Sequence, residues 1–249
     1  MRLILASSSP YRRALIARLG LACEATAPPY EEIRPSPQWD AAALVVENAL
    51  GKARAVASAV PPGTPTIVIG SDQVAVCDRE VLLKPGTAGR ARDQLARLSG
   101  REHELLTAVA IVASVGETSG LLASGLETRR LETHGLVASE LETNAREGAA
   151  SNDPAWEAYR LVRNRLRMRR LSTEEIAAYV KRERPLDCAG AYKSEGLGIA
   201  LFEYLRGDDP TAIVGLPLVT LCDLLRQAGL DPLLAEATTR DPARKGEED

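Results

Sequence analysis

The stretch RLILASSSPYRRALIARLG, residues 2–20, organises the rest of the chain. The apolar run at its start is typical of a buried strand, and three serines separate that strand from Pro10. Apolar residues at helical spacing then continue to Gly20, so Ser9 is expected to cap a helix that begins at Pro10. The sequence therefore predicts a strand, a short serine loop and a helix.

This loop has the composition of a phosphate-binding turn. Backbone N–H groups and hydroxyls meet there at the positive end of a helix dipole. Arg12 and Arg13 lie in the first turn, where positive side chains oppose the dipole unless an anion binds between them. The alternative is an ordinary strand-to-helix turn with two solvated arginines, and this stretch alone leaves both interpretations open.

The composition is that of a soluble globular protein, with 249 residues, 45% hydrophobic and 26% charged. The net charge of −3 gives no reason to expect a nucleic-acid surface, and no apolar run is long enough to span a membrane. The beginning of the chain has no signal-peptide pattern, and the four cysteines are widely spaced and match no metal motif. We therefore expect a reduced, cytoplasmic protein.

The pattern along the chain predicts a single domain over residues 1–235 and a polar, disordered tail at 236–249. An insertion is expected at about 125–160, because periodicity is weak there and Leu-Glu-Thr occurs three times. Alternating arginines and apolar residues resume near Leu161, which predicts a half-exposed strand. Three arginines on one face could attract an anion, but we expect this face to be solvated or paired with carboxylates.

Several buried-type strands are predicted downstream of the first unit. The run TIVIG at 66–70 is one of them, and it ends in Ser71, Asp72 and Gln73. A carboxylate just beyond the end of a buried strand is a common place for chemistry in α/β folds. Shorter strands are predicted at 197–202 and 211–214.

Lysine is scarce in this chain, because only five of 31 basic residues are lysine. Lys181 and Lys245 lie in charge-rich, solvated segments, but each of the other three lysines indicates a position where a compact ammonium is needed. Lys52 is one such position, on a helix predicted from Asp40 to about Ala59, and it shares a helix face with Asn48.

Acidic and basic candidates alternate along the chain, each at the end of a predicted element: Glu31, Glu32, Asp72 and Glu195, with Arg13, Lys52, Lys84 and Lys193. Cleavage of a polyphosphate needs this mixture, because carboxylates hold a divalent metal and orient water while cations neutralise phosphate oxygens. Taken singly, each residue is more often a surface charge or a structural ion pair. The sequence by itself does not show that they converge.

The sequence resembles the Maf family of nucleoside triphosphate pyrophosphatases. The resemblance is carried, in the family's order, by the acidic pair after Pro29 and by LILASSSPYRR (3–13), ENALGKA (47–53), IGSDQV (69–74), LLKP (82–85), LSGREHELLTAVA (98–110), DCAGAYKSEGLG (187–198) and IVGLPL (213–218). Two small departures are Glu31, where the family usually has aspartate, and Leu83, where glycine is common before the lysine.

The resemblance implies an α/β fold with an elongated mixed sheet flanked by helices, two lobes and a central active-site cleft. It implies attack of water between the α and β phosphates, with a homodimer in the cytoplasm. Asp72 matches the proton acceptor, with Glu32, Lys52 and Lys84 as further catalytic residues. A divalent cation, Mg²⁺ or Mn²⁺, is expected at Glu32 and Asp72. The substrate-binding positions implied are Ser7, Arg13 and Lys193.

Three positions resemble the family's specificity set: Tyr11, Gln73 and Glu195. A carboxylate at Glu195 can accept both donors of the guanine Watson–Crick edge, whereas uracil presents one donor between two acceptors. Stacking on Tyr11 would gain about 0.5–2 kcal/mol from a cationic, N7-methylated base. The resemblance thus implies the branch of the family that hydrolyses 7-methyl-GTP to 7-methyl-GMP and pyrophosphate.

Two alternatives remain open at this stage. One is a dTTP or UTP pyrophosphatase of the same family. The other is a non-catalytic nucleotide-binding regulator that uses the expected insertion as its contact surface.

Overall fold

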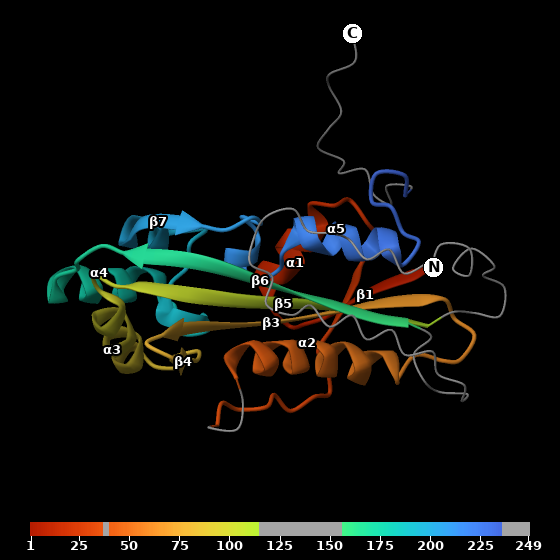
Figure 1. Cartoon of the computed structure of the whole chain (residues 1–249), viewed down its shortest axis with the longest axis horizontal. Coiled ribbons are helices and arrows are strands. Elements are labelled where there is room, and N and C mark those ends of the chain that lie inside the picture. Colours follow the sequence, from red (N-terminus) through yellow and green to blue (C-terminus); the bar gives the residue numbers. More distant parts are fainter. Residues whose placement is uncertain (37–39, 115–155, 236–249) are drawn as a thin grey trace, which may run out of the picture.

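The computed structural model describes residues 1–36, 40–114 and 156–235, which form a long mixed sheet covered by helices (Figure 1). The strand order is β2-β1-β3-β5-β6-β7, and β4 pairs with β3. β1 runs parallel to β2 and β3, whereas the other pairs are antiparallel. The strands are β1 (Arg2–Ala6), β2 (Glu24–Thr26), β3 (Thr66–Cys77), β4 (Glu80–Leu82), β5 (Glu102–Ser114), β6 (Trp156–Met168) and β7 (Phe202–Arg206).

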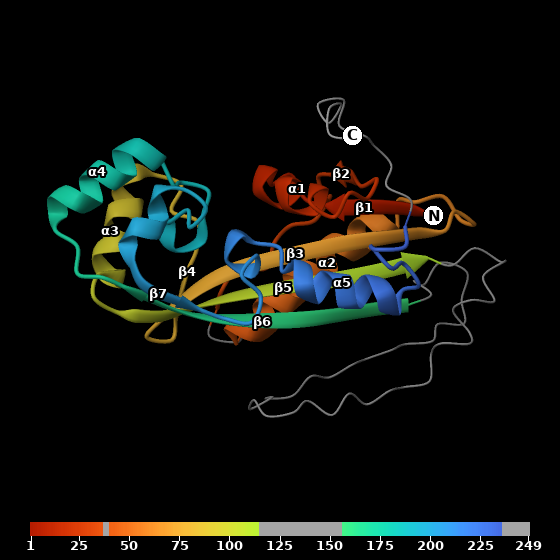
Figure 2. The same cartoon turned by 90° about the horizontal axis from the view of Figure 1, so that it is seen from above.

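Helices cover the sheet from both sides and at one end. In Figure 1, α2 lies against one face of the long strands, and α1 and α5 lie on the other. α3 and α4 gather beyond them at one end of the sheet, as Figure 2 shows from above. The helices are α1 (Pro10–Ala17), α2 (Ala41–Ala57), α3 (Ala88–Leu98), α4 (Thr173–Glu183) and α5 (Leu218–Gln227), with 3-10 turns η1 (Ala189–Ala191), η2 (Leu197–Leu201) and η3 (Ala212–Val214).

Separate apolar clusters give the molecule its two lobes. One cluster lies between the sheet and α1 with α5, and two smaller ones lie under α2. The other lobe has its own cluster, built mainly from α3, α4 and the adjoining ends of β3, β5 and β6. The predicted architecture, an elongated mixed sheet flanked by helices, is confirmed. Among the helices in the described ranges, none is both long and apolar enough to cross a membrane.

The predicted helix starts are confirmed by their caps. Ser9 accepts a hydrogen bond from the Arg12 N–H, and Pro10 is the first residue of α1. Asp40 accepts from two backbone N–H groups at the start of α2. Ser172 and Glu175 form a reciprocal capping box at α4. Local sequence fixes these ends because each cap satisfies N–H groups that the helix leaves free.

The prediction that a strand ends before Asp72 is wrong, because β3 runs without a break from Thr66 to Cys77. β5 pairs with β3 along almost its whole length. On the other edge, β1 pairs with β3 only as far as Ile69, and β4 begins to pair at Ala75. Asp72 therefore lies on the one edge of β3 where neither β1 nor β4 pairs with it, while β5 pairs with its other edge.

The strands predicted at 197–202 and 211–214 are also wrong. Residues Leu197–Leu201 form the turn η2, and β7 begins only at Phe202. Residues Ala212–Val214 form the turn η3, which is closed by hydrogen bonds between backbone groups of residues 209–215. Short apolar runs do not distinguish a strand from a buried turn, and here Gly215, with φ +117°, lets the chain reverse.

β6 begins at Trp156, earlier than the expected Leu161, so the last residues assigned to the insertion belong to the sheet. The rest of that expected insertion, and the tail at 236–249, lie outside the described residues. The arginine face of β6 is paired with carboxylates, as one of the two interpretations predicted. Arg163, Arg165 and Arg167 meet Glu104, Glu102 and Glu203.

Candidate active site

A cavity of about 310 Å³ opens where β3 lacks its neighbours. Its walls come from segments far apart in the sequence: the serine loop before α1, α2, β3, the residues after β4, and the segments around η1 and η3. The predicted site residues that line it are Ser7, Tyr11, Glu32, Lys52, Asp72, Gln73, Lys84 and Glu195. The structure thus brings together most of the predicted site residues, which the sequence analysis assigned to the ends of different helices and strands.

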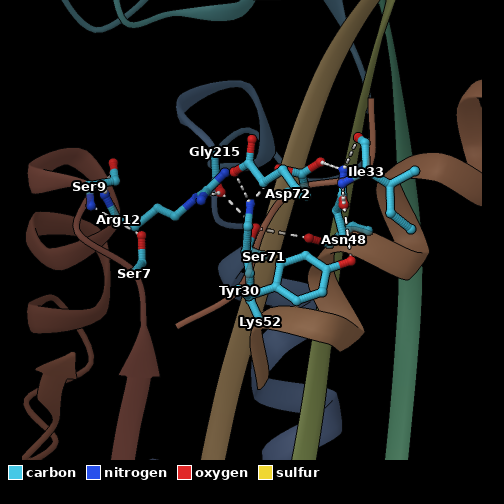
Figure 3. A network of polar contacts seen from close by, with 12 residues as sticks. Ser7, Ser9, Arg12, Tyr30, Ile33, Asn48, Lys52, Ser71, Asp72 and Gly215 are labelled. Carbon is cyan, nitrogen blue, oxygen red and sulfur yellow. Dashed lines mark hydrogen bonds and ion pairs between the residues drawn. The ribbon is translucent and has the colours of Figure 1, made fainter. Parts of the chain in front are cut away.

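Lys52 is the centre of the charged part of this cavity (Figure 3). Its Nζ lies 2.7 Å from Asp72 Oδ1 and 2.6 Å from Glu32 Oε1. Lys52 and Asp72 are 5% and 7% exposed, whereas the Glu32 side chain is 48% exposed. Burial opposes ionisation of Glu32, but the nearby Lys52, supported by Lys84 and Arg12, outweighs it and lowers the pKa of that carboxyl. Glu32 is therefore favoured in its ionised form where it contacts Lys52.

Asn48 supplies a second contact to Asp72 from the same helix face. Its Nδ2 donates to Asp72 Oδ2 at 3.2 Å and to the carbonyl of Ile33 at 3.1 Å. Both oxygens of the Asp72 carboxylate are therefore held by donors on α2. The predicted common face of Asn48 and Lys52 is confirmed.

Arg12, and not Arg13, is the arginine at the cavity. Arg12 Nε donates to the carbonyl of Gly215 at 2.8 Å, and the side chain lines the cavity. Burial lowers the pKa of the Arg12 guanidinium, an effect that Asp72 and Glu32 oppose. Arg13 is exposed and lies outside the cavity lining. The phosphate role expected at Arg13 stays a prediction, and Arg12 is the arginine that the structure places at the cavity.

A signal for Arg12 was present in the sequence. The buried residues of α1 are Leu15 and Ile16, and Arg12 precedes them by three and four positions. Those spacings place all three side chains on one helix face, whereas Arg13 points elsewhere. This shared face identifies Arg12 as the cavity arginine only when the packing of α1 beside the cavity is known.

The serine loop presents its hydroxyl as predicted. Ser7 is buried, lines the cavity and accepts a hydrogen bond from the Ser9 N–H at 3.1 Å. Its own O–H has no acceptor among the described residues, so it can donate to a ligand. The loop lies at the start of α1, where the helix dipole favours an anion.

Tyr11 and Glu195 both line the cavity. Lys193 Nζ lies 5.7 Å from the centre of the Tyr11 ring and donates to the carbonyl of Glu183 at 3.0 Å. Lys193 itself is outside the cavity lining. Its role as a direct substrate ligand stays a prediction, and the structure places its ammonium beside the Tyr11 ring.

Gln73 has its amide orientation fixed by the protein. Nε2 donates to the carbonyl of Ala212 at 2.8 Å and to that of Ile213 at 3.3 Å, and also to Thr107 Oγ1 at 2.9 Å. Because carbonyl oxygens only accept, the amide cannot be turned round. Gln73 lines the cavity, so only its oxygen is free for a ligand. The sequence could not reveal this, since η3 and β5 are distant in the chain.

The residues present fit a divalent cation in part. Two carboxylates, Glu32 and Asp72, meet at one point beside open cavity, and Mg²⁺ is commonly held by one or two carboxylates with substrate phosphates and water. Within the three described ranges, no group of three or more His, Cys, Asp or Glu side chains gathers into a metal site. A cation here would therefore need oxygen ligands from the substrate.

Comparison with known proteins identifies the family of this chain. The family model described as "Maf-like protein" matches residues 2–155 and 148–228. A 7-methyl-GTP pyrophosphatase of Chromohalobacter salexigens is 40% identical over 232 residues, covering 93% of this chain and 98% of that protein. Proteins of the same name from Nitrosococcus oceani (40% over 228 residues, 91% and 93% covered) and Bordetella pertussis (41% over 233 residues, 93% and 94% covered) are similarly close. The chain therefore belongs to the Maf family.

Proposed function

We propose that this protein is a pyrophosphatase that hydrolyses 7-methyl-GTP to 7-methyl-GMP and pyrophosphate, removing modified nucleotides. The proposal rests on one observation: Asp72 and Glu32 both contact the ammonium of Lys52 inside the cavity. The names of the three relatives support the same substrate. The whole family-like part of the chain, residues 1–235, would act as one catalytic domain.

In this proposal Asp72 accepts a proton from the attacking water. The water oxygen bonds to the α-phosphorus, the bond from that phosphorus to the α–β bridging oxygen breaks, and pyrophosphate leaves. Lys52, Lys84 and Arg12 neutralise phosphate oxygens, and Ser7 donates a hydrogen bond to the anion. Mg²⁺ or Mn²⁺ held by Glu32 and Asp72 would supply further charge neutralisation at the phosphates.

Base recognition in this proposal depends on acceptors and one aromatic ring. Glu195 offers carboxylate oxygens, and Gln73 offers only its amide oxygen because its nitrogen is engaged. Guanine presents adjacent donors at N1 and the 2-amino group, which suits such acceptors. Tyr11 provides the face on which a cationic methylated base stacks most favourably. We further propose a cytoplasmic homodimer, as implied by the family.

The experiment is pyrophosphate release from 7-methyl-GTP, GTP, dTTP and UTP, each with Mg²⁺, with Mn²⁺ and with a chelator. We expect the highest kcat/KM on 7-methyl-GTP and no release in the chelator. A preference for dTTP or UTP would keep the mechanism and overturn the base assignment. Absence of release from every nucleotide by a folded protein would favour the non-catalytic regulator.

Glu195→Gln is expected to lower kcat/KM for 7-methyl-GTP by roughly 10- to 50-fold. The amide keeps one acceptor oxygen, but its NH2 group would face a donor of the guanine edge. The rate on UTP should change less than about threefold, because its edge presents a single donor. Parallel kinetics on both substrates measure this difference. Glu174→Gln, at an exposed position of α4, is the matched control. An equal loss on both nucleotides would remove Glu195 from base recognition.

A further inference from the structure

Asn48 has every hydrogen-bonding position of its amide occupied (Figure 3). Its Oδ1 accepts from the backbone N–H of Ile33 at 2.8 Å and from the hydroxyl of Tyr30 at 3.3 Å. Its Nδ2 donates to the carbonyl of Ile33 at 3.1 Å and to Asp72 Oδ2 at 3.2 Å. The residue is 3% exposed, so no bulk water substitutes for these partners. Asn48 thus connects Asp72 to the loop around Ile33, which precedes α2.

The orientation of this amide is unambiguous. The N–H of Ile33 can only donate and its carbonyl can only accept, so Oδ1 and Nδ2 of Asn48 must face them respectively. It follows that a donor, and not an acceptor, faces Asp72. The same two bonds hold Ile33, whose neighbour Glu32 contacts Lys52.

We propose that Asn48 is a positioning residue that fixes the Asp72 carboxylate and holds the Glu32 segment against Lys52. The proposal rests on the proposed function, in which Asp72 is the proton acceptor. Lys52 and Asn48 hold one carboxylate oxygen each and lie one turn apart on the same face of α2, so the plane of the carboxylate is set by one rigid element. Each oxygen keeps a lone pair for water, since a carboxylate accepts about four hydrogen bonds. Such orientation of a reacting group contributes to rate without contributing to substrate affinity.

The test uses Asn48→Asp, which keeps the shape and the acceptor toward the Ile33 N–H and Tyr30 but places an oxygen against both Asp72 and the Ile33 carbonyl. We expect kcat on 7-methyl-GTP to fall by roughly 10²-fold with KM within about threefold, because positioning of the base is lost and phosphate binding is not. Asn48→Ala, which adds no charge, serves as a second variant if the first does not fold. A rise in KM with kcat retained would overturn the proposal.

A double variant separates positioning from general damage. In Asn48→Asp combined with Asp72→Asn, amide and carboxylate exchange places. The hydrogen bond between positions 48 and 72 can then form again, but position 72 still lacks the carboxylate that accepts the proton. We expect its thermal midpoint to exceed that of Asn48→Asp, and its single-turnover rate to stay within about threefold of Asp72→Asn alone. If Asn48→Asp lowers the rate in the Asp72→Asn background by the same factor as in the wild type, Asn48 does not act through Asp72.

Tyr30→Phe is the matched control, because it removes one hydrogen bond from Asn48 on the side away from the carboxylates. We expect its kcat to remain within about twofold of the wild type, and a 10²-fold loss would contradict the assignment of the effect to Asp72. Failure of the proposed function gives a different result: the wild type would then release no pyrophosphate, or Asp72→Asn would retain the wild-type rate.

Discussion

Asp72→Asn is expected to lower kcat on 7-methyl-GTP by roughly 10³-fold while leaving nucleotide affinity within about threefold. An amide keeps the shape of the side chain and a hydrogen-bond acceptor for Lys52, but it cannot take a proton from water at neutral pH. General-base catalysis typically contributes 10²- to 10⁴-fold, so most of the rate depends on this one group. Steady-state kinetics and binding of a non-hydrolysable 7-methyl-GTP analogue measure the two quantities separately.

The structure gives this prediction a clear control. Asp93→Asn removes an equal charge from an exposed position of α3 and should leave kcat unchanged. Asp72→Asn should still fold, because Glu32 remains as a partner for Lys52, although the new amide loses the hydrogen bond from Asn48 Nδ2. A variant that hydrolyses 7-methyl-GTP at near wild-type rate would show that another group accepts the proton.

Lys52→Met is expected to have the second large effect, on both activity and stability. The substitution keeps the apolar stem but leaves two carboxylates facing each other without their shared cation. Breaking a buried ion pair costs about 3–5 kcal/mol, and the half-exposure of Glu32 reduces that to roughly 3 kcal/mol here. For a chain of this size we expect the thermal midpoint to fall by about 6–12 °C.

The same substitution should lower kcat/KM by roughly 10³-fold, because a fixed cation beside the phosphates is lost. Thermal unfolding and pyrophosphate release at a temperature where the variant is folded measure the two effects. Lys181→Met, at an exposed position of α4, is the matched control and should change neither. A fully active Lys52→Met protein would mean that Lys52 only stabilises the fold.

Local features of the fold were predictable from the sequence. The caps at Ser9, Asp40 and Ser172 involve residues within three positions of each other, so the sequence contains all the information they need. The same holds for Asn48 and Lys52, whose shared face follows from helix periodicity. The prediction that a strand ends before Asp72 was wrong. The unpaired edge at Asp72 depends on where pairing with β1 stops and pairing with β4 starts, which the local sequence does not specify.

The sequence by itself determined the family, the residue types of the site and most of their positions. Only the tertiary structure decided how they act together, because those contacts join segments distant in the chain. Packing of α1 selected Arg12 over Arg13, and the turn η3 fixed Gln73 as an acceptor. Packing of α2 against β3 and the 30–33 loop put Asn48 and Lys52 on the two oxygens of Asp72. These contacts follow from the register and packing of whole elements, which no local pattern of residues specifies.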